Sequence, residues 1–401
     1  MFFSLFLILF LGIMGGYIFE KIKLPKLIWY LFVGILFGPS VLNIIDDSLL
    51  SLSSYLRQIA LVIILTRSGL SLDFKTLKQI GRPAILMCFL PACFEIIGVV
   101  IFAPLLLNIS YIEAMLLGSV LAAVSPAVVV PRMIRLKEKG YGRSHHIPEL
   151  IMAGASCDDI FVIILFYCFK GIVSNQNIDI NMALQIPTSI ILGLILGMLV
   201  GFILFFLFKK LKWSVITKTI LMLALSFGLL ALEEFAKPYI SISALLAIIV
   251  FSIILLKKDK EEATKIQKNY TSLWSFFEII LFTLVGCATD IHYAFSVEGA
   301  ILLGIILIAL CFRMLGVFLC LIATKFPWKE KLFVVLSYLP KATVQASIGG
   351  IALSEGLSCG ILVLTAAVLS IVITAPFGAA LMDFSYSKLL EKEIPCFENE
   401  V

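Results

Sequence analysis

Apolar runs of about 17 to 25 residues recur along the whole chain and are separated by short polar connections. A helix needs about 20 apolar residues to cross the hydrocarbon core of a bilayer. The composition agrees, because 14% of the residues are charged, whereas soluble domains average about 25%. The pattern predicts an all-α polytopic membrane protein. The net charge of +5 is therefore interpreted through membrane topology, and no nucleic-acid partner is expected.

Thirteen apolar windows qualify as candidate transmembrane helices. They cover residues 2–19, 27–45, 54–71, 83–107, 112–134, 148–169, 184–208, 213–232, 239–256, 271–289, 299–323, 330–352 and 360–382.

The distribution of Lys and Arg supports this division. If the N-terminus lies outside, 24 of the 31 basic residues fall on the inner connections. Cytoplasmic loops carry an excess of Lys and Arg, so the expected topology has the N-terminus outside and the C-terminus in the cytoplasm. A bacterial inner membrane is the expected location for so compact a chain.

Two of these windows are interrupted by proline within a small, polar stretch. Ser125 and Pro126 interrupt the fifth window, and Pro340, Lys341 and Thr343 interrupt the twelfth. Proline removes a backbone donor and clashes with the preceding turn, so both helices should break. The breaks lie seven windows apart. Because successive windows cross the membrane in opposite directions, an odd offset means that the two broken helices also run in opposite directions. We therefore expect inverted repeats whose two broken helices cross at the binding site.

Asp158 and Asp159 lie next to each other inside an apolar run. One ionised Asp at the bilayer centre costs roughly 2.5 to 3.5 kcal/mol, so the pair predicts a functional site. A carboxylate in a small cavity can hold a proton or a hard cation, but hardly both. Ser125 and Ser156 could supply further oxygen ligands, which hard cations prefer. This pattern indicates cation/proton exchange, with the transported Na⁺ or Li⁺ bound at the two aspartates.

Three further charged residues lie within the apolar windows. Lys341, beside the second break, is expected to offset the partial charge of half-helix C-terminal ends. Glu95 and Arg313 lie in matched windows and should form a buried ion pair. Arg313 could instead pair with Asp158, and a shared network is a third alternative. If Glu95 and Arg313 form an isolated pair, exchanging the two charges (Glu95→Arg with Arg313→Glu) should recover stability.

Five motifs carry a family resemblance: VSPAVVVP at 124–131, GYG at 140–142, SCDDI at 156–160, LPKATVQA at 339–346 and ITAP at 373–376. In this combination and order they closely resemble the sodium/proton antiporters, and best the NHA-type branch of the monovalent cation:proton antiporter-2 group. The resemblance implies a homodimer in which a mobile core carries the site across the membrane like an elevator. The transported ions are the implied ligands, no cofactor is expected, and pH homeostasis is the implied role.

The resemblance also divides the chain. It implies a scaffold and dimerisation segment at 1–82, a second scaffold segment at 213–297, core segments at 83–170 and 298–382, a linker at 171–212 and a cytoplasmic tail at 383–401.

The resemblance assigns roles to individual residues. Asp159 matches the principal ion- and proton-binding aspartate, and Asp158 matches its partner. Arg313 stands where many electrogenic relatives have lysine, and Glu95 matches the acid that pairs with arginine in the NHA branch. This difference at Arg313 leaves the exchange stoichiometry open.

Other functions fit the sequence less well. A membrane aspartyl protease needs its two aspartates on separate helices, so adjacent residues disfavour an enzyme. A sodium-coupled organic-anion symporter would share the broken-helix architecture and is the alternative transporter. A potassium/proton exchanger is a further alternative, although the short tail disfavours regulation by an appended soluble domain.

Overall fold

The computed structural model describes residues 1–72, 78–174, 180–211, 213–236, 240 and 242–392. Within these residues the regular structure is α-helical, apart from one isolated antiparallel bridge between Tyr141 and Lys392. Parts of the expected connections and tail lie outside the described residues, among them Lys75, Lys212, Lys237 and the segment 393–401.

Nine helical stretches in the described part of the chain are long and apolar enough to cross a membrane. They are α1 (Phe2–Lys21), α6 with α7 (Arg82–Met87 and Leu90–Leu107), α8 with α9 (Tyr111–Leu121 and Pro126–Glu138), α10 (Ile147–Ser174), α11 (Ile180–Lys210), α12 (Val215–Ala236), α14 (Lys260–Cys287), α16 (Val297–Leu321) and α20 (Gly360–Leu389). The chain is therefore an integral membrane protein of the expected all-α class.

The other four expected spans coincide with helices that are shorter or less apolar. These are α2 (Lys26–Phe37), α4 (Ser53–Ser71), α13 (Ala244–Lys258) and the interrupted series α17 (Trp328–Ser337), α18 (Thr343–Ile348) and α19 (Ile351–Ser354). Two short helices, α3 (Asp47–Leu50) and α15 (Ile291–Ala294), lie in connections. The total of thirteen spans stays a prediction.

Helix boundaries differ from the sequence prediction in several places, and proline explains two of these differences. The window 27–45 contains a helix that ends at Phe37, because Pro39 holds the preceding Gly38 in an extended conformation with ψ 179°. The window 83–107 is divided at Cys88 and Phe89. Pro91 is the second residue of α7 and lacks the N–H that would continue the helix from the preceding turn.

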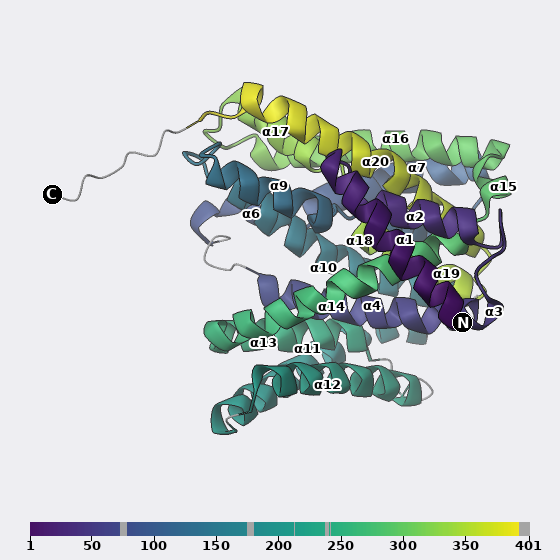
Figure 1. Ribbon diagram of the computed structural model, residues 1–401. Coiled ribbons are helices and arrows are strands. Elements are labelled where there is room, and N and C mark those ends of the chain that lie inside the picture. Colours follow the sequence, from purple (N-terminus) through teal and green to yellow (C-terminus); the bar gives the residue numbers. More distant parts are fainter. Residues whose placement is uncertain (73–77, 175–179, 212, 237–239, 241, 393–401) are drawn as a thin grey trace.

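The helices gather into two groups that run side by side (Figure 1). In one group α7 packs against α16, and α20 packs against α17 and α16. In the other group α14 packs against α2 and α4, while α13 packs against α11 and α4. Figure 1 shows α12 at the outer edge of the second group. The packing resembles the predicted division into core and scaffold, which itself stays a prediction.

A close backbone contact fixes the crossing of α2 and α14. Gly34 and Gly286 face each other with little space, since a Cβ built on either residue would lie 3.0 Å from the Cα of the other. Small residues let helices approach closely in membranes, where packing and hydrogen bonds drive association.

The two predicted helix breaks cross each other. Residues 122–125 separate α8 from α9, and residues 338–342 separate α17 from α18. The backbone N–H of Ser125 donates to the Pro340 carbonyl at 2.8 Å, which joins the two breaks directly. Pro126 is the first residue of α9, and the residue before a proline prefers an extended backbone. Ser125 follows this rule, with φ −86° and ψ 109°.

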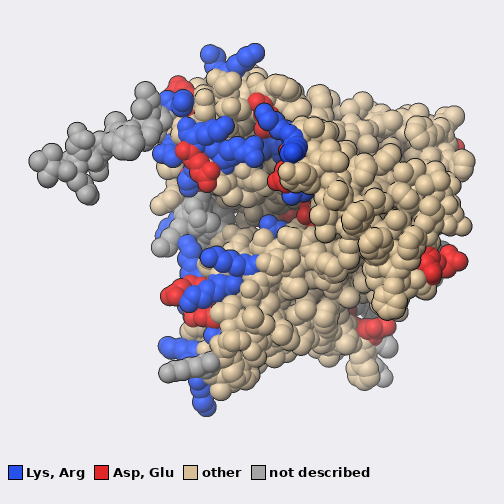
Figure 2. Space-filling view, viewed as in Figure 1, with Lys and Arg blue, Asp and Glu red and all other residues tan. Residues whose placement is uncertain are grey.

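Basic side chains gather at one end of the molecule. Figure 2 shows Lys and Arg concentrated along the left side of the view, whereas the broad middle carries mostly uncharged residues. Helix α1 begins at the opposite end from the C-terminal end of α20 (Figure 1). This distribution is what the positive-inside rule leads us to expect of a protein with its termini on opposite sides. Which end faces the cytoplasm stays a prediction.

Candidate functional site

Helix α10 places Asp158 and Asp159 inside the protein, where their side chains are 0% and 3% exposed. Adjacent residues on a helix project about 100° apart, so the two carboxylates have different neighbours. Gly154 lies one turn earlier on α10, and any side chain there would collide with the Tyr338 hydroxyl. The absent side chain at Gly154 therefore allows the second helix break to lie close to the aspartates.

Arg313 is fully buried on α16 and is held by groups from four other elements. Its guanidinium contacts Asp158 Oδ2 at 2.6 Å and Glu95 Oε2 at 2.9 Å. It also donates to the Tyr338 carbonyl at 2.9 Å and to the Ala122 carbonyl. Arg313 thus joins both carboxylates to both helix breaks. Of the pairings that the sequence leaves open, the structure contains the shared network.

Lys341 extends this network from the second break. Its ammonium group lies 2.6 Å from Glu95 Oε1 and donates to the Leu121 carbonyl at the C-terminal end of α8. Cations are favourable at that end of a helix. Both the predicted contact with a half-helix end and an ion pair with Glu95 are therefore present. The side chain is fully buried, as are its partners'.

The charges of these four residues balance. Lys341 contacts Glu95, Glu95 contacts Arg313, and Arg313 contacts Asp158, which also accepts from the Val124 N–H at 3.0 Å. Burial of charge is tolerable when ions are paired and hydrogen-bonded in this way. Asp159 has no ion pair among the described residues, so it is the carboxylate without a compensating cation at this site.

The two serines predicted as oxygen ligands, and Thr343 of the second break, occupy different environments. Ser125 is fully buried in the first break, and its hydroxyl has no hydrogen-bond partner among the described groups. Thr343, at the start of α18, is equally buried, and its hydroxyl also lacks a partner in the described part of the chain. Ser156 is half-buried, and its hydroxyl donates to the Met152 carbonyl of its own helix at 3.0 Å.

Two residues of the site escaped the sequence-based selection. Tyr338 supports Arg313 through its carbonyl, and the guanidinium carbon lies 5.5 Å from the centre of its ring. Gln345 is fully buried and donates to the Ala123 carbonyl at 2.9 Å. Both belong to the polar stretch around Pro340. Their polarity in an apolar window was the available signal, but their contacts depend on how the helices cross.

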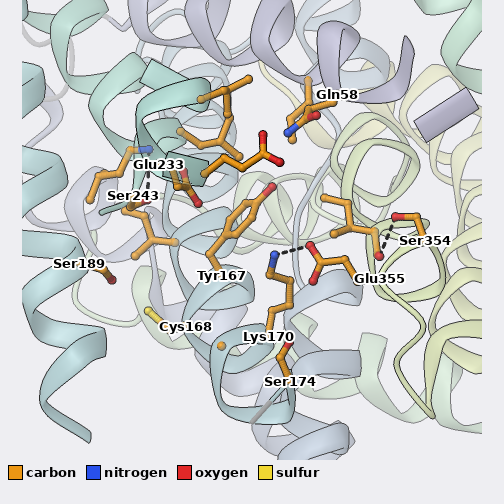
Figure 3. Close-up of a pocket in the computed structure, with 18 of the residues that line it drawn as sticks. Gln58, Tyr167, Cys168, Lys170, Ser174, Ser189, Glu233, Ser243, Ser354 and Glu355 are labelled. Carbon is orange, nitrogen blue, oxygen red and sulfur yellow. Dashed lines mark hydrogen bonds and ion pairs between the residues drawn. The ribbon is translucent and has the colours of Figure 1, made fainter. Parts of the chain in front are cut away.

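A cavity of about 990 Å³ separates the two groups of helices near the site. Its lining comes from α4, α8, α10, α11, α12, α13, α18 and α19 (Figure 3). Figure 3 shows Lys170 reaching Glu355, to which it is bound at 2.6 Å, with Tyr167 and Glu233 close by. Ile164 and Ser347 also line the cavity. Asp159 lies five residues before Ile164 on α10, about 7.5 Å along the helix axis.

The chain is similar in sequence to known proteins over almost its whole length. The family model described as "Sodium/hydrogen exchanger, transmembrane" matches residues 6–382. Sodium/hydrogen exchanger 9B1 of Homo sapiens is 34% identical over 412 residues, which cover 97% of this chain and 78% of the relative. Sodium/hydrogen exchanger 9B2 of Mus musculus is 32% identical over 418 residues, which cover 100% of this chain and 76% of the relative.

The fold also matches a solved transporter structure. The sodium proton antiporter MjNhaP1 from Methanocaldococcus jannaschii at pH 8 superposes with a TM-score of 0.81 at 22% identity. The match covers 96% of this chain and 97% of that chain. The all-helical fold with two crossed breaks is therefore an antiporter fold. With the match over residues 6–382, it follows that the chain belongs to the sodium/hydrogen exchanger family of transmembrane proteins.

Proposed function

We propose that the protein exchanges a monovalent cation, Na⁺ or Li⁺, for protons, with cation and proton competing for Asp159. The observation that carries this proposal is the charge balance of the site. Glu95 and Asp158 are each in contact with a buried cation, whereas Asp159 has no ion pair among the described residues. A buried carboxylate in that position needs either a proton or a cation to offset its charge.

Competition at one carboxylate is sufficient for coupled exchange. A protonated Asp159 is neutral and no longer binds a hard cation, since such a ligand must be deprotonated. A cation-bound Asp159 has no room for the proton. If the site crosses the membrane only when Asp159 is neutralised, each crossing carries one species or the other. The gradient of one ion then drives the other in the opposite direction.

Arg313 is better suited to hold the site together than to carry protons. It makes contacts with two carboxylates and two backbone carbonyls, all buried. An arginine guanidinium is effectively always protonated in proteins. Arg313 and Lys341 would therefore keep the broken helices and Asp158 in place while Asp159 changes its occupant.

The cavity supports access to Asp159 from one side. Its lining includes Ile164 on the helix that carries Asp159 and Ser347 on the second broken helix. Alternating access would require the two groups of helices to move so that the site opens to the other side in turn. The elevator type of movement and the homodimer stay predictions from the resemblance.

Cation-driven proton movement in proteoliposomes tests the proposed function. Vesicles with a preset pH gradient are challenged in turn with Na⁺, Li⁺ and K⁺, with protein-free vesicles as the control. We expect Na⁺ and Li⁺ to collapse the gradient. Collapse by K⁺ alone would replace the proposal with potassium/proton exchange. No response to any cation between pH 6 and 9 would refute exchange, and sodium uptake stimulated by organic anions would then identify a symporter.

A further inference from the structure

Six buried side-chain oxygens in or beside the two helix breaks lack a hydrogen-bond partner in the part of the chain that the structure describes. They are Ser125 Oγ, Asp158 Oδ1, Asp159 Oδ1, Tyr338 Oη, Thr343 Oγ1 and Gln345 Oε1. Buried polar atoms are nearly always paired, so each exception calls for an explanation. Gln345 is the most informative, because its amide oxygen can only accept, whereas a hydroxyl group can also donate and rotate.

The orientation of the Gln345 amide is fixed by its nitrogen. Nε2 donates to the Ala123 carbonyl at 2.9 Å and lies 3.3 Å from the Leu121 carbonyl. The opposite orientation would place the amide oxygen against two carbonyl oxygens, which is repulsive. Oε1 is therefore directed away from the end of α8 and cannot be exchanged with Nε2.

The charged and backbone donors described around the breaks already have acceptors, and the hydroxyls of Ser125, Tyr338 and Thr343 make no hydrogen bond to Gln345 Oε1. Arg313 donates to Glu95, Asp158 and two carbonyls, and the Lys341 ammonium contacts Glu95 and the Leu121 carbonyl. The Val124 N–H donates to Asp158. The remaining candidates for Gln345 Oε1 are a water molecule and a cation.

Gln345 lies between the cavity and the crossed breaks. Ser347, which lines the cavity, follows Gln345 by two residues, about 3 Å along the axis of α18. On the other side, the Gln345 amide contacts Ala123 in the first break. Helices α10 and α18 pack against each other, so the helix that carries Gln345 lies beside the helix that carries Asp159.

The geometry points to Gln345 as a neutral oxygen ligand of the transported cation, on the cavity side of Asp159, where it sets the preference between Na⁺ and Li⁺. This inference rests on the proposed function. Hard cations prefer oxygen, and ligand number and cavity size decide between cations of different radius. The smaller Li⁺ needs fewer ligands than Na⁺.

Substitution of Gln345 tests the assignment through the ratio of two apparent KM values. Gln345→Met removes the oxygen with little change in size, and we expect it to raise the apparent KM for Na⁺ about tenfold and that for Li⁺ less. Gln345→Asn keeps an amide oxygen and an amide nitrogen on a shorter side chain and should retain more of the preference for Na⁺ than Gln345→Met. Gln58→Met is the matched control, because Gln58 lines the same cavity from α4 (Figure 3) and should leave both values unchanged.

Binding provides a second readout that does not depend on transport. Na⁺ should raise the thermal stability of the purified wild-type protein, since a ligand of the folded state stabilises it, and Gln345→Met should shift this response to higher Na⁺ concentration. An unchanged Na⁺/Li⁺ ratio in Gln345→Met, with only a lower maximal rate or stability, would assign Gln345 a structural role and overturn the inference. A wild-type protein without cation-driven proton movement would instead refute the proposed function.

Discussion

Asp159→Asn is expected to reduce cation/proton exchange to the level of protein-free vesicles while the protein stays folded. Asparagine has nearly the same size but carries no charge, so the site neither binds a proton nor attracts a cation. Folding should be retained, because Asp159 has no ion pair among the described residues and its replacement leaves no cation unpaired. Cation-driven proton movement in proteoliposomes, together with a thermal unfolding curve, measures both properties.

A second aspartate provides the control for this substitution. Asp47 is exposed in the connection after α2, and Asp47→Asn should exchange at the wild-type rate. Exchange at the normal rate by Asp159→Asn would remove Asp159 from the mechanism. Loss of exchange together with loss of folding would show that Asp159 is needed for structure, contrary to our expectation.

Arg313→Met is expected to cause the largest loss of stability at the site. The change leaves Asp158 without a cation and removes one of two cations from Glu95, both fully buried. Breaking a buried ion pair by removing one partner costs about 3 to 5 kcal/mol. Arg135→Met, on the exposed surface of α9, is the matched control and should change stability little. Thermal or denaturant unfolding in detergent measures the difference, and equal stability of the two variants would contradict the buried network.

Paired substitutions test how the network is shared. Glu95→Gln with Lys341→Met removes one negative and one positive charge and leaves the contact between Arg313 and Asp158. The double variant should be more stable than the sum of the single effects predicts, by about 0.5 to 3 kcal/mol. An isolated pair would tolerate the exchange of its charges, Glu95→Arg with Arg313→Glu, but here this exchange should not restore stability. It would place a glutamate at position 313 against Asp158 and an arginine at position 95 against Lys341.

Local chemistry explains how much of the fold the sequence predicts. Hydropathy locates the helices because each must cross the same apolar layer. The breaks before Pro126 and Pro340 are predictable since proline acts within one turn of its own position. Pro91 gave the same signal for the break between α6 and α7, but it was not used in the sequence prediction. The end of α2 at Phe37, earlier than predicted, likewise depends on Pro39.

The sequence predicts which residues form the site better than it predicts which of them contact each other. Charged residues in an apolar window stand out by their cost, which singles out Glu95, Arg313, Lys341 and the two aspartates. Their pairing depends on the rotation and depth of several packed helices, which no local pattern contains. Gln345 shows most clearly what the sequence does not predict. An uncharged amide in a helix is unremarkable until the structure shows that its nitrogen donates to the Ala123 carbonyl.

The dependence of the apparent KM for Na⁺ on pH tests most directly the claim that cation and proton share Asp159. Exchange is measured in wild-type proteoliposomes over a range of Na⁺ concentrations at several pH values. If one proton competes with Na⁺, the apparent KM should rise about tenfold for each unit by which the pH falls, at pH values where Asp159 is mostly protonated in the absence of Na⁺. The maximal rate should stay nearly constant. A KM that is independent of pH, with a maximal rate that changes instead, would show that proton and cation bind at different places.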